Sequence, residues 1–414
     1  MSVRHATMGA VSASSPWAAP RTQPDRCPGL LRPHQAADGA LVRLRIPGGV
    51  ISAAALTEVA AVATEFGDGQ VRLTSRGNLQ LRSVPVDAEG DVPAEMVDRI
   101  AAAGLLPSAR HELVRNIVCS PLTGRVGGRA DLRPLLAELD ARLCASSELA
   151  ALPGRFLFAL DDGRGDVLPL AHDLGVLAVD AEYVRLSAAG AVGAPIPLHR
   201  AAGELLVLAR RFLARRGAAW HVRELDGAPL IPDAGDPMLP LGGPLDFGRL
   251  TQVDGQGLLS LGVPLATLTA DQVDAVATAA TRSGSGMLVV TPWRGLLLPD
   301  LREDAAQPAA AGLILDPESP WRNISACAGA PGCVKAAAAT RPVAALLAGT
   351  GCSASTPGVH VVACARRCGA PSGEHIQVLA GPSGFTVSGP SGRPDINCDA
   401  AHLAQVVARA RNGS

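Results

Sequence analysis

The chain has 414 residues, of which 48% are hydrophobic and 18% charged, as in a globular protein with two or three domains of about 150 residues each. Its net charge of −1 excludes attraction of nucleic acid or an anionic membrane by an overall field, so an anionic ligand would need a local basic patch. No apolar run approaches the roughly 18 residues that a membrane-spanning helix requires.

Residues 1–30 are rich in Ala, Ser, Pro and Arg and lack the continuous apolar core of a signal peptide. They predict a disordered tail. With neither a signal peptide nor a membrane span, we expect the protein in the cytoplasm, where thiols stay reduced. Clustered cysteines there are metal ligands or catalysts before they are disulfides.

Two segments, residues 38–82 and 255–299, are copies of one unit, 217 residues apart. Each copy begins with an extended run that ends in a proline, at Pro47 and at Pro264. A helix follows, with apolar residues at positions i, i+3 and i+7, and then a second strand that ends at a threonine. The repeat predicts two related α+β halves.

Both ends of the repeated helix carry sequence signals. Ser52 and Thr269 are the predicted N-caps, and Thr269 forms a capping box with Gln272. Gly67 and Gly284 stand where a C-capping glycine belongs. The two helices are therefore predicted to have the same bounds in both copies.

The repeat continues downstream, because Arg-Asn-Ile recurs at 115–117 and 322–324, now 207 residues apart. The Pro/Gly-rich stretch 228–248 is the natural joint between the halves. We predict a pseudo-two-fold α+β body.

The first copy carries polar side chains that the second copy mostly lacks. Side chains alternate along a strand, so we expect Arg43 and Arg45 to share one face. The next segment places Arg76, Asn78, Gln80 and Arg82 in the same way. For a single arginine a solvated strand face is the alternative. The whole set, with Arg115 and Asn116 added, favours an anion site, and guanidinium groups suit a polycarboxylated guest.

Four cysteines form two pairs, Cys327 with Cys333 and Cys364 with Cys368. Thiolates from two short loops can hold an iron–sulfur cluster. A structural zinc site is the rival interpretation: Cys-x3-Cys fits a zinc arm, whereas Cys-x5-Cys exceeds the usual spacing. The other cysteines beyond the tail are interpreted as small buried hydrophobes: Cys119, Cys144, Cys352 and Cys398.

The order of these motifs resembles the nitrite/sulfite reductase family. The matching segments are Val-Arg-Leu-Arg-Ile-Pro-Gly-Gly at 42–49, Leu-Thr-Ser-Arg-Gly-Asn-Leu-Gln-Leu-Arg at 73–82, Val-Arg-Asn-Ile-Val at 114–118 and the cysteine pairs. The resemblance covers nearly the whole chain. It implies an α+β fold with two pseudo-two-fold related ferredoxin-like half-domains and two α/β cluster-type domains.

The resemblance also implies domain boundaries. After the tail, residues 31–108 would be the first half-domain and 109–235 an α/β sirohaem/cluster-type domain without cluster cysteines. Residues 236–305 would be the second half-domain, and 306–414 the domain that binds a 4Fe–4S cluster.

Site residues follow from the same resemblance. The cluster ligands would be Cys327, Cys333, Cys364 and Cys368. The tetrapyrrole-binding residues would be Arg43, Arg45, Arg76, Asn78, Gln80, Arg115, Asn116 and Arg155.

One segment departs from the family pattern. The six-electron reductases hold and protonate sulfite or nitrite with a Lys-x-Lys pair, and here Arg155 and Leu157 occupy those positions. A guanidinium is a poor proton donor and leucine donates nothing. The departure is more similar to a branch of the family in which the tetrapyrrole is the substrate and not the cofactor.

In that branch, the resemblance implies oxygen-dependent hydroxylation and γ-lactone formation on precorrin-3A in aerobic cobalamin biosynthesis, a monooxygenase reaction that yields precorrin-3B. The eight carboxylates of precorrin-3A suit an arginine-rich surface. An additional non-haem iron is also implied, and its candidate ligands by residue type alone are His111, His172, His221, His360 and His375.

The chain has no convincing nucleotide-binding loop, so electrons from NADH are expected through a separate reductase or a ferredoxin. The catalytic residues stay unassigned. Two alternatives remain: an assimilatory nitrite or sulfite reductase carrying sirohaem, and a non-catalytic iron–sulfur electron carrier or tetrapyrrole-binding protein.

Overall fold

The computed structural model describes residues 25–235, 242, 245–350, 357–371, 374–390 and 394–412. Most of the predicted tail, and Cys352, lie outside the described residues. The described end of the tail is packed, because Cys27 and Leu30 are only 8% and 1% exposed. Among the described helices, none has the length and apolar character needed to cross a bilayer.

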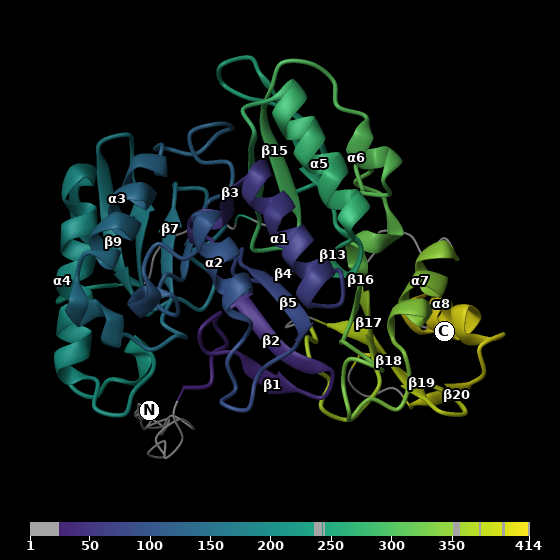
Figure 1. The fold of residues 1–414 in the computed structure, drawn as a ribbon. Helices are drawn as coiled ribbons and strands as arrows, with labels where there is room; N and C mark the ends of the chain where they lie inside the picture. The colour runs from purple at the N-terminus through teal and green to yellow at the C-terminus, as the bar shows by residue number, and fades with distance from the viewer. Residues whose placement is uncertain are drawn as a thin grey trace, which may run out of the picture.

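The predicted α+β class is confirmed by four five-stranded sheets (Figure 1). The first sheet has the order β1 (His34–Ala36), β2 (Gly39–Leu44), β5 (Leu79–Val84), β4 (Val71–Leu73), β13 (Thr267–Leu268). The third has the order β11 (Gly248–Thr251), β12 (Gly257–Leu261), β15 (Leu296–Leu301), β14 (Met287–Val290), β3 (Val50–Ser52). Each repeat therefore lends one strand to the other: β13 pairs with β4, and β3 pairs with β14.

The repeated helices are α1 (Ala53–Phe66) and α5 (Ala270–Ser283), which pack side by side in the centre of the molecule (Figure 1). The predicted caps are confirmed: the Ser52 hydroxyl accepts from the amide N–H of Ala55 at 3.1 Å, and Thr269 forms its capping box with Gln272. Apolar faces of both helices belong to one core that spans the two repeats. The short α2 (Ala94–Ala102) packs against α1.

The other two sheets share one topology. The first runs β10 (Ala191–Pro197), β9 (Tyr183–Ala188), β8 (Leu174–Ala178), β7 (Phe158–Asp161), β6 (Ile117–Cys119). The second runs β16 (Ile324–Ala326), β17 (Gly358–Val362), β18 (His375–Gly381), β19 (Gly384–Ser388), β20 (Ile396–Cys398). In each sheet the first three strands in chain order pair in parallel, and the last two pairings are antiparallel, so only the fourth strand, β9 or β19, runs opposite to the others.

Helices complete these two domains, each around a core of its own. The first domain has α3 (Arg133–Cys144) and α4 (Ala201–Arg215), and the second has α7 (Arg341–Gly349) and α8 (Leu403–Asn412), with the short α6 (Gln307–Ala310) before it. Figure 1 shows the first domain and the C-terminal domain on opposite sides of the paired repeats. The domain boundaries stay a prediction.

Candidate functional site

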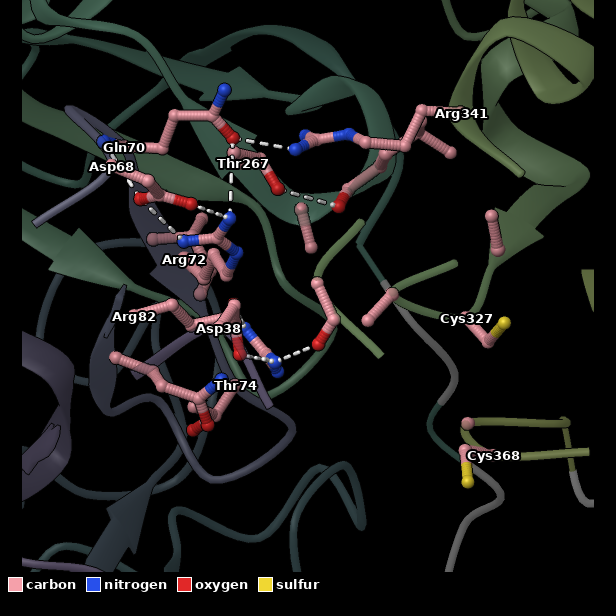
Figure 2. Close-up of a pocket in the computed structure, with 18 of the residues that line it drawn as sticks. Asp38, Asp68, Gln70, Arg72, Thr74, Arg82, Thr267, Cys327, Arg341 and Cys368 are labelled. Carbon is pink, nitrogen blue, oxygen red and sulfur yellow. Dashed lines mark hydrogen bonds and ion pairs between the residues drawn. The ribbon is translucent and has the colours of Figure 1, made fainter. Parts of the chain in front are cut away.

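A cavity of about 720 Å³ lies where the first repeat meets the C-terminal domain. Its walls come from β2, β4 and β5, from the turn before β15, and from the loops that follow β16 and β17. Five arginines line it: Arg43, Arg72, Arg82, Arg294 and Arg341. Figure 2 shows Cys327 and Cys368 on one side of the cavity, with Arg72 and Arg82 on the other.

Three of these arginines are held by neighbours within the protein (Figure 2). Arg72 forms an ion pair with Asp68, and Arg341 donates to the Gln70 side chain. Arg82 binds Asp38 through two N–H groups, at 3.0 and 2.7 Å. The charges of Arg72 and Arg82 are thus partly neutralised by carboxylates, whereas Arg341 is held by a neutral amide.

Arg43 is less completely satisfied. Its Nη2 donates to Gln80 Oε1 at 3.0 Å, while its Nε is buried and makes no hydrogen bond with the described residues. Burial lowers the pKa of the Arg43 guanidinium, and the nearby charges of Arg76 and Arg155 lower it further. A ligand carboxylate beside Arg43 would relieve this repulsion.

Arg294 is the cavity residue that contradicts the expectation of an apolar second copy. Burial lowers the pKa of its guanidinium. Sequence reasoning missed Arg294, along with Arg72 and Arg341. Only the alignment of Thr74–Asn78 with Thr291–Gly295 could have drawn attention to Arg294.

The four predicted cluster cysteines lie on two loops that leave the same sheet edge. β16 and β17 are parallel neighbours, with Ala326 opposite Val361, so the chain exits both strands side by side. The first loop starts at Cys327, whose N–H donates to the Val361 carbonyl at 2.9 Å, and the second carries Cys364. All four residues are free thiols, and Cys368 is exposed. The fold thus delivers four thiols to one edge.

His360 ties the second loop to the sheet. Its Nδ1 contacts Ser325 Oγ at 2.8 Å and its Nε2 contacts the Cys368 carbonyl at 3.2 Å. Burial, assisted by His375 and Arg294, lowers the pKa of this imidazole to about 4. His360 is therefore neutral near pH 7.

Three of the predicted site residues are bound within the protein on either side of the contact between the first repeat and the first α/β domain, where Asn78 Nδ2 donates to Asn116 Oδ1 at 3.3 Å. Arg115 binds Asp140 of α3 through two N–H groups at 2.8 and 2.7 Å. Asn116 donates to the Gly154 carbonyl at 2.8 Å, and Asn78 accepts from the Ile46 N–H at 2.8 Å. None of the three lines the cavity.

Arg45, Arg76 and Arg155 lie under or beside the described end of the N-terminal tail. Arg45 Nη1 donates to the Pro28 carbonyl at 2.7 Å, and burial followed by the Arg43 charge lowers its pKa to about 10. Arg155 stacks on Trp220 at 5.1 Å, and its carbonyl accepts from Arg76 at 3.0 Å. Of the two arginines expected to share a face, only Arg43 lines the cavity; Arg45 lies just beyond the end of β2 at Leu44.

Leu157, at the departure from the family pattern, is 3% exposed and packs in a small apolar cluster. Its N–H donates to Asp173 Oδ2 at 2.9 Å. The position therefore has an apolar and structural role.

The histidines proposed for an additional iron do not form one cluster, although His360 and His375 lie edge to face with their ring centroids 6.0 Å apart. His111 and His172 use both ring nitrogens in contacts with neighbouring serines and carbonyls, and His221 contacts Asp173 at 3.2 Å. Within the described ranges, the one group of three or more His, Cys, Asp or Glu ligand atoms within 4.8 Å of one another is Asp161, Asp162 and Asp166. The described residues do not fit a histidine-bound iron.

Each carboxylate of that acidic cluster accepts hydrogen bonds from the chain, although Asp166 Oδ2 is buried without a hydrogen-bond partner among the described residues. Asp161 accepts from the N–H groups of four residues in the loop that follows it, at 2.9 to 3.1 Å. Asp162 binds Arg164 through two N–H groups, and Asp166 accepts from Ser120 Oγ at 2.5 Å. Burial raises the pKa of Asp166 to about 7.

The sequence model of the nitrite/sulfite reductase ferredoxin-like half domain matches residues 32–100 and 251–314. These segments contain most of the two repeat copies, so the resemblance and the half-domain fold predicted from the sequence are confirmed.

Three relatives align with different shares of the chain. The chain is 27% identical to precorrin-3B synthase of a Sinorhizobium species, over 92% of this chain and 87% of that protein. It is 28% identical to a ferredoxin sulfite reductase of Mycolicibacterium paratuberculosis, over 73% of this chain and 61% of that protein. It is 34% identical to ferredoxin–nitrite reductase of Synechococcus elongatus, over 30% of this chain and 25% of that protein.

Among solved structures, the NirA protein of Mycobacterium tuberculosis superposes with a TM-score of 0.65 at 21% identity. The superposition covers 89% of this chain and 80% of that chain. It shows a shared fold.

Proposed function

Because the chain carries both ferredoxin-like half-domains of the nitrite/sulfite reductase family, we propose that it acts as a precorrin-3B synthase. It would hydroxylate precorrin-3A and close a γ-lactone, with dioxygen as the oxidant, in aerobic cobalamin biosynthesis. The observation that carries the proposal is the arginine-lined cavity with two of the four paired cysteines in its wall. The arginine side chains of this wall can bind the carboxylates of a macrocycle. A cluster held by the cysteines would then lie beside the macrocycle, which must receive the electrons.

The cavity supplies binding and orientation. Arg43 is the least satisfied guanidinium of the first half-domain wall, and Gln80 fixes its direction. Guanidinium groups bind carboxylates through paired, charge-assisted hydrogen bonds. Arg72, Arg82 and Arg341 are already bound to other side chains of the cavity wall. They therefore add positive charge to the cavity but have less freedom to move.

We propose that the two cysteine loops hold a 4Fe–4S cluster through Cys327, Cys333, Cys364 and Cys368. A single tetrahedral zinc ion would need its thiolates about 3.8 Å apart. Among the described residues, no three of these sulfurs lie within 4.8 Å of one another, so the loops would have to close before one zinc ion could be bound. When bound, a 4Fe–4S cluster supplies electrons one at a time to a partner in the cavity.

The proposed reaction uses both atoms of dioxygen. One oxygen atom of dioxygen enters the macrocycle as the C20 hydroxyl, and the other leaves as water after uptake of two electrons and two protons. The ring A acetate carboxylate forms the lactone C–O bond to the ring carbon next to C20; the double bond between that carbon and C20 is lost, and the carboxyl proton ends on the C20 oxygen. The protein's own part is to orient the macrocycle through its carboxylates and to exclude water. We propose that NADH supplies the electrons through a reductase or a ferredoxin, in the cytoplasm.

A sirohaem-dependent nitrite or sulfite reductase is the second candidate, favoured by the similarity to the sulfite and nitrite reductases. Leu157 argues against it. The side chain is buried and apolar, so it cannot hold or protonate a small anion as the second lysine of those enzymes does.

The test is conversion of precorrin-3A by protein purified without air, with NADH and a ferredoxin reductase system supplied. We expect the hydroxylated lactone under air and unchanged substrate under argon. No conversion in air by protein with full iron and sulfide content would contradict the proposal. Sirohaem absorption bands together with sulfite or nitrite reduction would establish the second candidate instead.

A further inference from the structure

Arg294 sits in a strained backbone conformation at the edge of the cavity. It is the fourth residue of the turn Thr291–Gly295 that joins β14 to β15, and its φ is 64°. The turn is closed by the Thr291 N–H, which donates to the Gly295 carbonyl at 2.9 Å, and by the Gly295 N–H, which donates to Thr291 Oγ1 at 3.0 Å. An L-residue with a side chain is disfavoured at this φ, where glycine is not.

The first half-domain shows that this turn does not need an arginine. The corresponding turn, Thr74–Asn78, is closed by the same backbone bond and the same threonine hydroxyl contact, at 2.9 and 3.1 Å. Its fourth residue is Gly77, with a φ of 65°. Glycine therefore performs the structural task in one copy, and arginine occupies the equivalent place in the other despite the strain.

No acidic side chain in the described part of the protein forms an ion pair with Arg294. The other four cavity arginines each have a side-chain partner: Asp68 for Arg72, Asp38 for Arg82, and glutamines for Arg43 and Arg341. No hydrogen bond or ion pair joins the Arg294 guanidinium to any described residue, and it lies partly buried in the cavity wall. A strained residue with an unpaired charge points to a ligand.

Arg294 and the two cysteine loops face the same cavity. Arg294 lines it together with Cys327 and Cys368. Arg43 belongs to a different wall, on β2 of the first half-domain. Arg43 and Arg294, neither of which is paired with a carboxylate among the described residues, thus come from the two half-domains.

We infer that Arg294 binds a carboxylate of the ligand and, with Arg43, fixes which edge of a polycarboxylated tetrapyrrole faces the cysteine loops. This inference rests on the proposed function, since it concerns the same cavity. It assigns to the second half-domain a part in ligand specificity. The ligand class is a tetrapyrrole macrocycle with carboxylates on opposite edges.

The experiment measures binding of uroporphyrin, an octacarboxylated tetrapyrrole, to the cluster-loaded protein. The signal is the quenching of the protein's fluorescence when uroporphyrin binds. The variants are Arg294→Gly, Arg294→Lys and, as a matched control on the same half-domain, Arg302→Gln, whose exposed side chain lies outside the cavity. We expect R294G to weaken binding at least tenfold while its Tm stays equal or rises, because glycine relieves the turn. R294K should lose less affinity than R294G, and R302Q should bind like the wild type.

Two results would overturn the inference, and they are distinguishable. Wild-type protein that binds uroporphyrin, with R294G binding it equally well, removes Arg294 from the site and leaves the proposed function standing. Wild-type protein that fails to bind uroporphyrin contradicts both.

Discussion

The two α/β sheets have the same strand order and directions, yet their carboxyl edges carry different chemistry. At the edge of β6 and β7 lie Ser120 and a buried acidic cluster. At the edge of β16 and β17 lie the two cysteine loops. Ser120 occupies the place of Cys327 in the repeat, 207 residues earlier. The same scaffold therefore supports two kinds of edge. The edge of β6 and β7, closed by contacts within the chain, is called the sealed edge; the edge of β16 and β17, which carries the cysteine loops and is able to hold a metal cluster, is called the open edge.

The sealed edge shows what the open edge lacks. Asp161 is surrounded by four N–H donors of its own loop, Asp162 is bound by Arg164, and Ser120 donates to Asp166. Every carboxylate there has a partner from the chain. The cysteine thiols are free. A metal-holding edge needs loops whose side chains do not satisfy one another.

The largest effect is expected from removing a thiol at the open edge. Cys364→Ala should reduce bound iron and acid-labile sulfide to near zero, because a cluster held by four thiolates loses a ligand. Iron and sulfide analysis of protein purified without air measures this. Cys144→Ala, outside the loops, is the control and should keep the full content; a C364A protein with full iron content would refute the ligand assignment.

At the sealed edge, the next largest effect is on stability. Asp161→Ala leaves four buried N–H groups without an acceptor, at about 1–3 kcal/mol each, so we expect a loss of at least about 4 kcal/mol. Urea unfolding gives the value. Asp304→Ala removes an ion pair whose carboxylate side chain is 86% exposed, and it should change stability by less than about 1 kcal/mol. Equal effects of the two would contradict the sealed-edge interpretation.

The pH dependence of stability follows from Asp166. Its pKa is raised from 3.8 to about 7 in the folded protein, so between these values the folded state binds more protons and stability falls as pH rises. Asp166→Asn removes this titration. The stability of D166N relative to wild type should therefore increase from pH 4 to pH 7, by about 3 kcal/mol, and stay constant above. A constant difference across this range would show that Asp166 titrates normally.

The smallest predicted effect separates cavity residues from structural ones. Arg43→Gln should weaken uroporphyrin binding about tenfold, or about 1.4 kcal/mol, with little change in Tm. Arg115→Gln breaks the pair with Asp140 away from the cavity, so it should lower Tm and leave affinity within about twofold. The reverse pattern would return Arg115 to the binding site.

Local patterns in the sequence predicted much of the fold. The caps at Ser52 and Thr269 and the repeat offset depend on neighbouring residues, so they could be read before the structure was known. The cysteine pairs could be placed on two loops for the same reason. The exchange of β3 and β13 between the repeats could not be predicted, because it depends on how the halves pack together.

The predicted arginine face was only partly correct for a similar reason. Sequence alternation placed Gln80 beside Arg43 correctly. It could not show that Arg45 is covered by Pro28 or that Asp140 binds Arg115, since both partners are distant in sequence. Arg294 was missed because its importance depends on a turn geometry and on a cavity built from several segments.

The most direct test of the central claim is the fate of labelled dioxygen. Precorrin-3A, the cluster-loaded protein and a reductant are incubated under heavy-isotope dioxygen, and the product and the water are examined by mass spectrometry. We predict one labelled oxygen atom in the macrocycle and one in water. A product without the label, or intact substrate in the presence of a full cluster, would contradict the assignment as an oxygen-dependent tetrapyrrole hydroxylase.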